Sequence, residues 1–277
     1  MRQEARGKKQ EARGRMAEAG HGTHGVIYCA DARHMAEVDD GSVQLVVTSP
    51  PYNVGKAYVD HNDSLPLDEY LDFLDEVWRE CYRVLAPGGR LAINVANTNR
   101  QPYLSLVSMI DERLRTMAGC RWLHRGHIVW DKGPSVGVST AWGSFARASN
   151  PVLRDVHEYV TVWSKERFDL PGSLGRLSGI TNQDFVDWTR SIWQFPTETK
   201  VDHPAPFPVE LPRRLILLYT SPGDTVLDPF MGSGSTALAA RLTGRRYIGY
   251  EISAEYCELA RKRLRQLEET GGNGATR

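Results

Sequence analysis

The stretch TVLDPFMGSGSTALAARL, residues 225–242, is the strongest indication of the fold class. Residues 225–230 predict a short buried strand, residues 231–235 a glycine-rich turn, and residues 236–242 the start of a helix. Gly232 and Gly234 let the backbone come close to a ligand, and the N–H groups at a helix start favour a carboxylate or a phosphate. By itself such a turn could serve any nucleotide or be no more than a tight turn.

An acidic residue stands at the end of the next predicted strand. After a turn at Gly244, the sequence YIGYE at residues 247–251 predicts a strand that ends at Glu251. A carboxylate about twenty residues beyond such glycines has the spacing of a ribose-binding group. Glu251 is therefore the candidate for binding the ribose of a nucleotide.

A second motif, TSPPYN at residues 48–53, follows the apolar run VQLVV and so lies where another buried strand is predicted to end. Two consecutive prolines fix φ and remove two backbone donors, which leaves the carbonyl before each ring rigidly aimed outward. An exocyclic amine could donate to Ser49 Oγ and to the Pro50 carbonyl while its ring stacks on Tyr52. The alternative is an ordinary proline-rich turn after a strand.

Together the two motifs resemble those of the amino-group DNA methyltransferases, whose catalytic tetrapeptide matches Ser49 to Tyr52 and whose cofactor loop matches Asp228 to Gly234. The catalytic motif precedes the cofactor motif, which is similar to the permuted order of the beta class. The resemblance covers residues 26–264. It implies an α/β, Rossmann-like S-adenosylmethionine-dependent methyltransferase fold, with a mostly parallel central sheet and helices on both faces. Further family elements occur in the expected order at residues 29–31, 85–90, 128–132 and 203–208.

The resemblance also implies roles for individual residues. Ser49, Pro50, Pro51 and Tyr52 would form the catalytic set, with direct transfer of the methyl group to the amine and no covalent intermediate. Asp31 would bind the adenine amino group of S-adenosyl-L-methionine, although it could instead cap a short helix over residues 32–36. Asp228 could likewise cap its own loop. Besides Glu251, the implied cofactor-binding residues are Asp228, Pro229, Phe230, Gly232, Ser233, Gly234, His203 and Phe207.

The target base is open to two interpretations. Family members that modify cytosine N4 usually carry serine at the first position of the tetrapeptide, so Ser49 favours cytosine over adenine N6. Adenine N6 is the alternative, because the continuation NVGK at residues 53–56 is equally at home among some adenine enzymes. An RNA or protein-amide methyltransferase and an inactive DNA-binding module are less favoured alternatives. The permuted order argues against the protein-amide enzymes, and the retained Ser49, Tyr52 and glycines argue against an inactive module.

The composition predicts a cytoplasmic protein without a metal ion. A chain of 277 residues with 41% hydrophobic residues can bury one sizeable core, and no apolar run reaches membrane-spanning length. The four cysteines lie far apart, without the paired spacing of a zinc site. Because the net charge is zero, attraction to double-stranded DNA must come from local clusters of Lys and Arg. The resemblance leaves open a homodimer and a cognate restriction endonuclease as further partners.

The chain is expected to form a disordered charged tail over residues 1–22 and one catalytic domain over residues 23–277. Apolar residues at three- and four-residue steps over residues 71–85 predict an amphipathic helix packed on the sheet. Residues 133–200 break the alternation of strands and helices. Within them, residues 156–164 predict a strand, in which His157 is interpreted as a core histidine with Glu158 as its partner. This region is predicted to be the insertion that recognises the target sequence. The candidate DNA contacts are Asn53, Lys56, Arg147, Arg154, Arg176 and Arg190.

Overall fold

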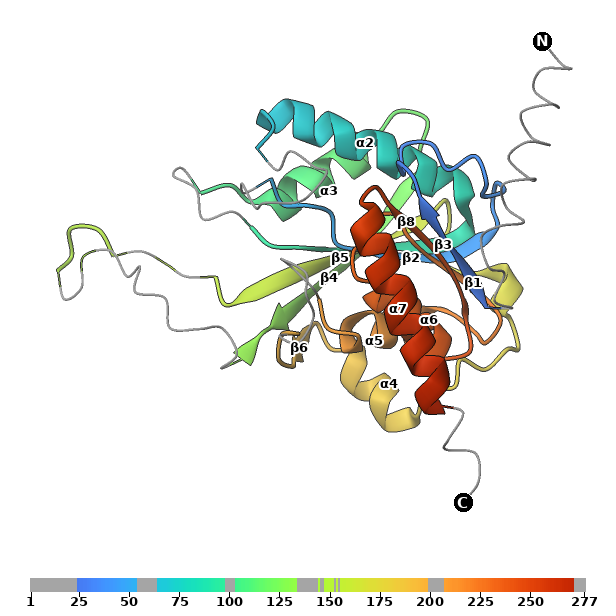
Figure 1. Cartoon of the computed structure of the whole chain (residues 1–277). Coiled ribbons are helices and arrows are strands. Elements are labelled where there is room, and N and C mark those ends of the chain that lie inside the picture. The colour runs from blue at the N-terminus through green and yellow to red at the C-terminus, as the bar shows by residue number, and fades with distance from the viewer. Residues whose placement is uncertain are drawn as a thin grey trace, which may run out of the picture.

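The structure is a computed structural model, and it describes residues 24–53, 64–97, 103–133, 144, 147–151, 153, 155–198 and 207–271. The predicted tail at residues 1–22 lies outside these ranges. One eight-stranded sheet forms the centre of the molecule (Figure 1). Its strands are β1 (Gly25–Cys29), β2 (Val43–Thr48), β3 (Leu85–Val95), β4 (Trp122–Asp131), β5 (His157–Lys165), β6 (Ile192–Gln194), β7 (Thr225–Asp228) and β8 (Arg246–Glu251).

The sheet has the strand order β1-β8-β7-β2-β3-β5-β4-β6. Neighbouring strands from β1 to β3 are parallel, which requires crossover connections such as helices between them. β5 runs antiparallel to both β3 and β4, and β6 is parallel to β4. The predicted α/β class with a mostly parallel central sheet is confirmed.

Helices bury apolar stripes on both faces of the sheet (Figure 1). α2 buries Leu71, Leu74, Trp78 and Cys81, so the predicted amphipathic helix is confirmed. α2 and α3 cover one face, α4, α5 and α6 contribute to the core on the other, and α7 packs on α6 and β1. Among the described residues, no helix combines the length and the apolarity needed to cross a membrane. The helices are α2 (Leu67–Val84), α3 (Leu106–Thr116), α4 (Asn182–Trp188), α5 (Glu210–Tyr219), α6 (Ser235–Leu242), α7 (Ala254–Gly271) and the short 3-10 helix η2 (Pro171–Ser173).

The connection between β1 and β2 differs from the sequence-based expectation. Residues 32–36 form turns and not a short helix. Met35 is fully buried, its N–H donates to the Glu80 carboxylate at 2.8 Å, and its carbonyl accepts from the Arg83 guanidinium at 2.8 Å. These side chains of α2 satisfy the backbone groups that a helix would have paired internally.

Part of the predicted insertion belongs to the central sheet. β5 lies between β3 and β4, with Trp163 opposite Leu91. The chain after β5 follows the amino-terminal edge of the parallel strands, where the Arg176 guanidinium contacts Asp224 Oδ1 at 2.6 Å, just before β7. This edge is opposite to the one at which β2 ends and the TSPPYN motif begins.

Candidate active site

Two loops meet at the carboxyl ends of neighbouring strands. β2 and β7 are adjacent and parallel, with Leu45 opposite Val226 and Val46 opposite Leu227. TSPPYN follows β2 and the glycine turn follows β7, so the shared strand direction brings both to the same edge of the sheet. Ligands of open α/β sheets bind in the crevice at this edge.

Asp228 joins the two loops. Its side chain is 1% exposed, and its carboxylate accepts hydrogen bonds from Thr48 Oγ1 at 2.7 Å, Thr236 Oγ1 at 2.7 Å and the Phe230 N–H at 3.1 Å. Burial raises the pKa of Asp228 to about 6, although these three donors act against the shift. The geometry supports the alternative in which Asp228 caps its own loop, and it extends that role to the residue before the catalytic tetrapeptide.

The glycine turn has a backbone that favours glycine. Gly232 (φ +49°) and Gly234 (φ +83°) both lie in the left-handed region, and a Cβ on Gly234 would lie 2.8 Å from the Ala260 Cβ of α7. Glu251, at the end of β8, accepts hydrogen bonds from the Gly232 N–H at 2.8 Å and from the Ser253 N–H at 3.0 Å. Glu251 therefore places a carboxylate directly beside the glycine turn, and a carboxylate is a hydrogen-bond acceptor for hydroxyl groups.

Asp31 lies next to the end of β8, because the Ala30 N–H donates to the Glu251 carbonyl at 3.0 Å. Its carboxylate accepts hydrogen bonds from the Arg33 N–H at 2.9 Å and from the Arg33 guanidinium at 2.7 Å. Burial acts to raise the pKa of Asp31, but the hydrogen bonds and the charge of Arg33 hold it below its ordinary value. Asp31 therefore caps a turn, and its side chain is still 40% exposed to a ligand.

The remaining cofactor candidates have different surroundings. Phe230 packs against aromatic rings of α2, and the Ser233 hydroxyl accepts a hydrogen bond from an arginine of α7 at 2.9 Å. Pro229 is buried, and Phe207 is buried in the core with residues of α5. His203 lies outside the described residues.

The catalytic turn is fixed from two sides. Tyr70 of α2 donates its hydroxyl hydrogen to the Pro51 carbonyl at 2.6 Å. Asn53 is buried with φ +55°, and its amide exchanges two hydrogen bonds with the backbone of Leu65, at 2.8 and 2.7 Å. These bonds engage both polar atoms of the Asn53 side chain, so its position supports a structural role in place of the predicted DNA contact. Within the described ranges no group donates to the Pro50 carbonyl.

Ser49 and Tyr52 belong to a hydrogen-bond network that is not predicted from the sequence. Tyr52 donates its hydroxyl hydrogen to Glu158 Oε2 at 3.1 Å, and Ser49 Oγ lies 2.8 Å from the Tyr52 oxygen. Asn94 Nδ2 donates to the same Glu158 oxygen at 2.6 Å, and the Lys132 ammonium forms an ion pair with the other oxygen. Asn94 is 1% exposed and Glu158 is 8% exposed. This network connects β3, β5 and the residue that follows β4 to the turn after β2.

The network determines the direction of the bond between Ser49 and Tyr52. A tyrosine hydroxyl carries one hydrogen, and Tyr52 gives it to Glu158, which as a carboxylate only accepts. The Ser49 hydroxyl must then donate to the Tyr52 oxygen. Its own oxygen, to which Asn94 Nδ2 is a long-range donor at 3.5 Å, still offers a second acceptor position, which is the property that an incoming amine requires.

The predicted pairing of His157 with Glu158 is wrong. Successive residues of a strand point to opposite faces of the sheet, so two neighbours cannot pair across it. His157 instead meets the Tyr159 ring at 4.9 Å between centroids. The sequence does contain a signal for the true role, because a glutamate within the apolar strand β5 is buried and requires hydrogen-bonding partners.

The candidate DNA contacts are not brought together by the structure. Arg147 and Arg190 are exposed. Arg176 binds Asp224 and the Pro222 carbonyl, both at 2.6 Å, on the edge of the sheet opposite to Ser49. Lys56 and Arg154 lie outside the described residues.

One sheet edge thus carries a loop suited to a nucleoside and, beside it, a turn suited to a planar amine. A group-transfer enzyme needs such adjacency, since donor and acceptor must meet in line. The fold and the site together define a Rossmann-like amino-group methyltransferase. Comparison with known families agrees: the model of the N6/N4 DNA methylase family matches residues 43–262, and the chain belongs to this family.

Individual relatives extend over most of the chain. The type II methyltransferase M.MjaI of Methanocaldococcus jannaschii is 33% identical over 267 residues, which cover 83% of this chain and 87% of the relative. The DNA adenine methyltransferase YhdJ of Escherichia coli is 28% identical over 260 residues, 86% of this chain and 82% of the relative. TTHA0409 of Thermus thermophilus is described as a DNA modification methylase and was solved with S-adenosyl-L-methionine. It superimposes with a TM-score of 0.67 at 33% identity and covers 88% of this chain and 95% of its own. The beta-class resemblance is confirmed.

Proposed function

We propose that this chain transfers a methyl group from S-adenosyl-L-methionine to the exocyclic amine of a flipped base in double-stranded DNA, with cytosine N4 favoured over adenine N6. The observation that carries the proposal is the bonding of Asp228 to Thr48 on one side and to Thr236 on the other. Thr48 immediately precedes the amine-binding turn, and Thr236 follows the glycine turn. The contact therefore holds a cofactor loop against an acceptor turn, the arrangement that in-line transfer requires.

The proposed cofactor lies across the carboxyl ends of β7, β8 and β1. The glycine turn at Gly232 and Gly234 holds the methionine part, with its backbone close to the ligand. Glu251, whose carboxylate holds the glycine turn through the Gly232 N–H, binds the ribose hydroxyls, and Asp31 accepts from the adenine amino group. S-adenosyl-L-methionine supplies the electrophilic methyl group.

The proposed mechanism uses hydrogen-bond acceptors and no covalent nucleophile. The lone pair of a base amine is delocalised into the ring, and accepting both N–H hydrogens localises it on nitrogen. Ser49 Oγ and the Pro50 carbonyl are the two acceptors, and Tyr52 stacks on the extruded base. Ser49 is ready for this role because Tyr52, whose hydrogen goes to Glu158, takes the Ser49 hydrogen.

The preference for cytosine rests on Ser49, the first residue of the tetrapeptide. The competing adenine assignment is supported by the relative described as a DNA adenine methyltransferase. We further propose that the exposed Arg147 and Arg190, in the region of residues 133–200, contact DNA.

Long-read sequencing of DNA from a methylation-free host that expresses the chain tests the function. We expect one short sequence motif to carry N4-methylcytosine, and a Tyr52→Ala variant to leave the same motif unmodified. N6-methyladenine in place of N4-methylcytosine would overturn the base assignment. Unmodified DNA from a folded protein that binds the cofactor would overturn the proposed function itself.

A further inference from the structure

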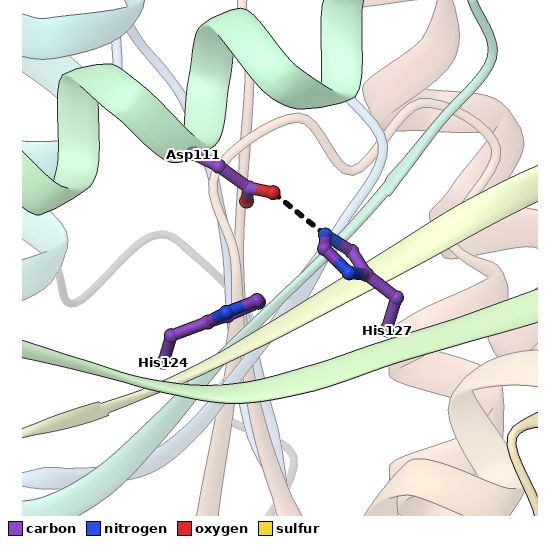
Figure 2. A group of neighbouring side chains, drawn as sticks. All are labelled: Asp111, His124 and His127. Atoms are coloured by element: carbon purple, nitrogen blue, oxygen red, sulfur yellow. Dashed lines mark hydrogen bonds and ion pairs between the residues drawn. The ribbon is translucent and has the colours of Figure 1, made fainter.

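Three side chains with metal-binding atoms converge between α3 and β4, away from the catalytic turn. Asp111 projects from α3 toward the sheet, and His124 and His127 project from β4 toward the helix (Figure 2). One ligand atom from each residue lies within 4.8 Å of the other two. Asp111 Oδ2 and His127 Nε2 are hydrogen-bonded at 2.6 Å.

A β-bulge places both imidazoles on one face. Residues three apart in a regular strand point to opposite faces. In β4 the register shifts between His124 and Gly126: His124 pairs with Trp163, whereas His127 pairs with Thr161. Since Trp163 and Thr161 are two apart in β5, they share a face, and so do the two histidines opposite them. Gly126 has φ +133°, a backbone conformation that suits glycine at this bulge.

The surroundings orient the three side chains. Thr161 Oγ1 and Trp163 Nε1 donate to Asp111 Oδ1 at 2.6 and 3.3 Å, which directs the other oxygen, Oδ2, toward His127. The His124 ring stacks on Trp163 at 4.4 Å between centroids. Hydrogen bonds and packing of this kind around ligand side chains are typical of metal sites, where they hold the ligands in place.

We propose that Asp111, His124 and His127 form a binding site for a first-row transition-metal ion, with Zn²⁺ as the best match. Two imidazole nitrogens and one carboxylate oxygen are ligands that Zn²⁺ takes, and water completes the coordination. An open hollow of about 390 Å³, lined by Asp111, His124 and Trp163 among others, gives access to solvent. The site departs from the metal-free prediction, which considered only the spacing of cysteines.

Metal binding replaces the hydrogen bond between Asp111 and His127. Two ligands of a tetrahedral zinc ion lie about 3.3 Å apart, so the two atoms must separate by less than about 1 Å from their present contact. The bound ion would join α3 to β4 and so stabilise the fold. Because Thr161 and Glu158 lie three apart in the regular strand β5, they face opposite sides of the sheet, and the metal site is separate from the catalytic network.

Metal titration of the full chain, after treatment with a chelator and dialysis, tests the proposal. Calorimetry with ZnCl₂ should show one tight equivalent, and CoCl₂ should give the visible absorption of a four- or five-coordinate Co²⁺ ion. In His124→Ala/His127→Ala this equivalent should bind at least about a hundredfold more weakly, and in Thr161→Val, which retains all three ligands, about tenfold more weakly. His24→Ala is the matched control and should keep the tight equivalent.

The thermal midpoint supplies a second measurement. Zn²⁺ should raise the Tm of the wild type and of His24→Ala but not that of the double variant, since only a folded state that binds the ion is stabilised. The double variant is accepted as folded when it retains its far-ultraviolet circular dichroism. Equal Zn²⁺ affinity in the wild type and the double variant would overturn the site, as would wild-type affinity in a folded Asp111→Asn variant. Each result would identify the cluster as an ion pair alone.

Discussion

Replacing Glu158 by glutamine should separate methyl transfer from cofactor binding. Glu158 accepts from Tyr52 and Asn94 through one oxygen and from Lys132 through the other. A glutamine offers one oxygen and one NH₂ group. In either orientation its NH₂ group meets a donor, either the Asn94 amide or the Lys132 ammonium.

The magnitude follows from the bond that is lost. A hydrogen bond to a charged group contributes about 1.5–3 kcal/mol, so the free energy of unfolding should fall by about 2 kcal/mol. When the NH₂ group faces Tyr52, the tyrosine hydrogen turns toward Ser49 Oγ and occupies the acceptor that the amine needs. We expect the rate of methyl transfer to fall by about ten- to a hundredfold, the range caused by small misplacements of reacting groups.

Three measurements on one protein preparation distinguish these effects. Urea denaturation gives the stability, calorimetry gives the affinity for S-adenosyl-L-methionine, and single-turnover transfer of a radiolabelled methyl group to unmethylated DNA gives the rate. The cofactor affinity should stay unchanged, because the proposed cofactor residues lie on β1, β7 and β8. Glu166→Gln, one residue beyond the other end of β5, is the matched control. Glu166 is exposed, and its side chain accepts a hydrogen bond from the Tyr82 hydroxyl at 3.2 Å. The amide oxygen of a glutamine can accept the same bond. The substitution should therefore change the free energy of unfolding by no more than about 0.5 kcal/mol.

A Glu158→Gln protein with wild-type stability and wild-type transfer rate would refute the network. Equal losses of transfer and cofactor affinity would refute the separation of roles and would mean that Glu158 supports the whole sheet edge.

Two further predictions concern the glycine turn and its buried aspartate, and a third concerns Arg176 at the opposite edge of the sheet. Gly234→Ala should lower the free energy of unfolding by about 1–3 kcal/mol and weaken cofactor binding, because φ is +83° and the new methyl group meets α7; urea denaturation and calorimetry measure both. Asp228→Asn should gain stability relative to the wild type as the pH rises from about 4 to 6. The pKa of Asp228 is raised to about 6, so the folded wild type binds this proton more tightly than the unfolded chain does. The wild type loses this contribution to its stability as the pH rises through about 6. The difference in stability between the variant and the wild type should change by about 2 kcal/mol between pH 4 and pH 7, and a difference that stays constant would contradict the raised pKa of Asp228. Arg176→Ala should destabilise the fold and weaken binding to site-bearing and scrambled duplexes equally, because Arg176 binds a buried carboxylate at the far edge of the sheet; a selective loss of specific binding would restore its predicted role in recognition.

The elements that are encoded locally could be predicted from the sequence. The strand, glycine turn and helix at residues 225–242 depend on neighbours within a few positions, and so does the amphipathic stripe of α2. A strand is also predicted from the sequence at residues 156–164, close to the observed β5, but its position between β3 and β4 is not. Strand order depends on pairings between distant segments, which a local pattern does not contain.

The network around the site depends on contacts between distant residues. Asn94 and Tyr52 reach Glu158 across 64 and 106 positions of the chain, and Thr48 reaches Asp228 across 180. No spacing rule connects such residues. The sequence therefore predicts which residues carry chemistry, namely the tetrapeptide and the glycines, and not which buried groups hold them in place.

The reversed direction of β5 brings Glu158 to the catalytic turn. In a parallel sheet only the carboxyl ends of strands reach the edge where TSPPYN lies. Because β5 runs antiparallel to β3, its first residues lie at this edge, with Tyr159 opposite Val95 at the end of β3. Glu158 can then bind Tyr52 from one side while Asp228, at the end of β7, binds Thr48 from the other. A parallel strand in the position of β5 would place the same glutamate at the opposite edge, so the one reversal in this part of the sheet allows the acceptor turn to be held from both flanks.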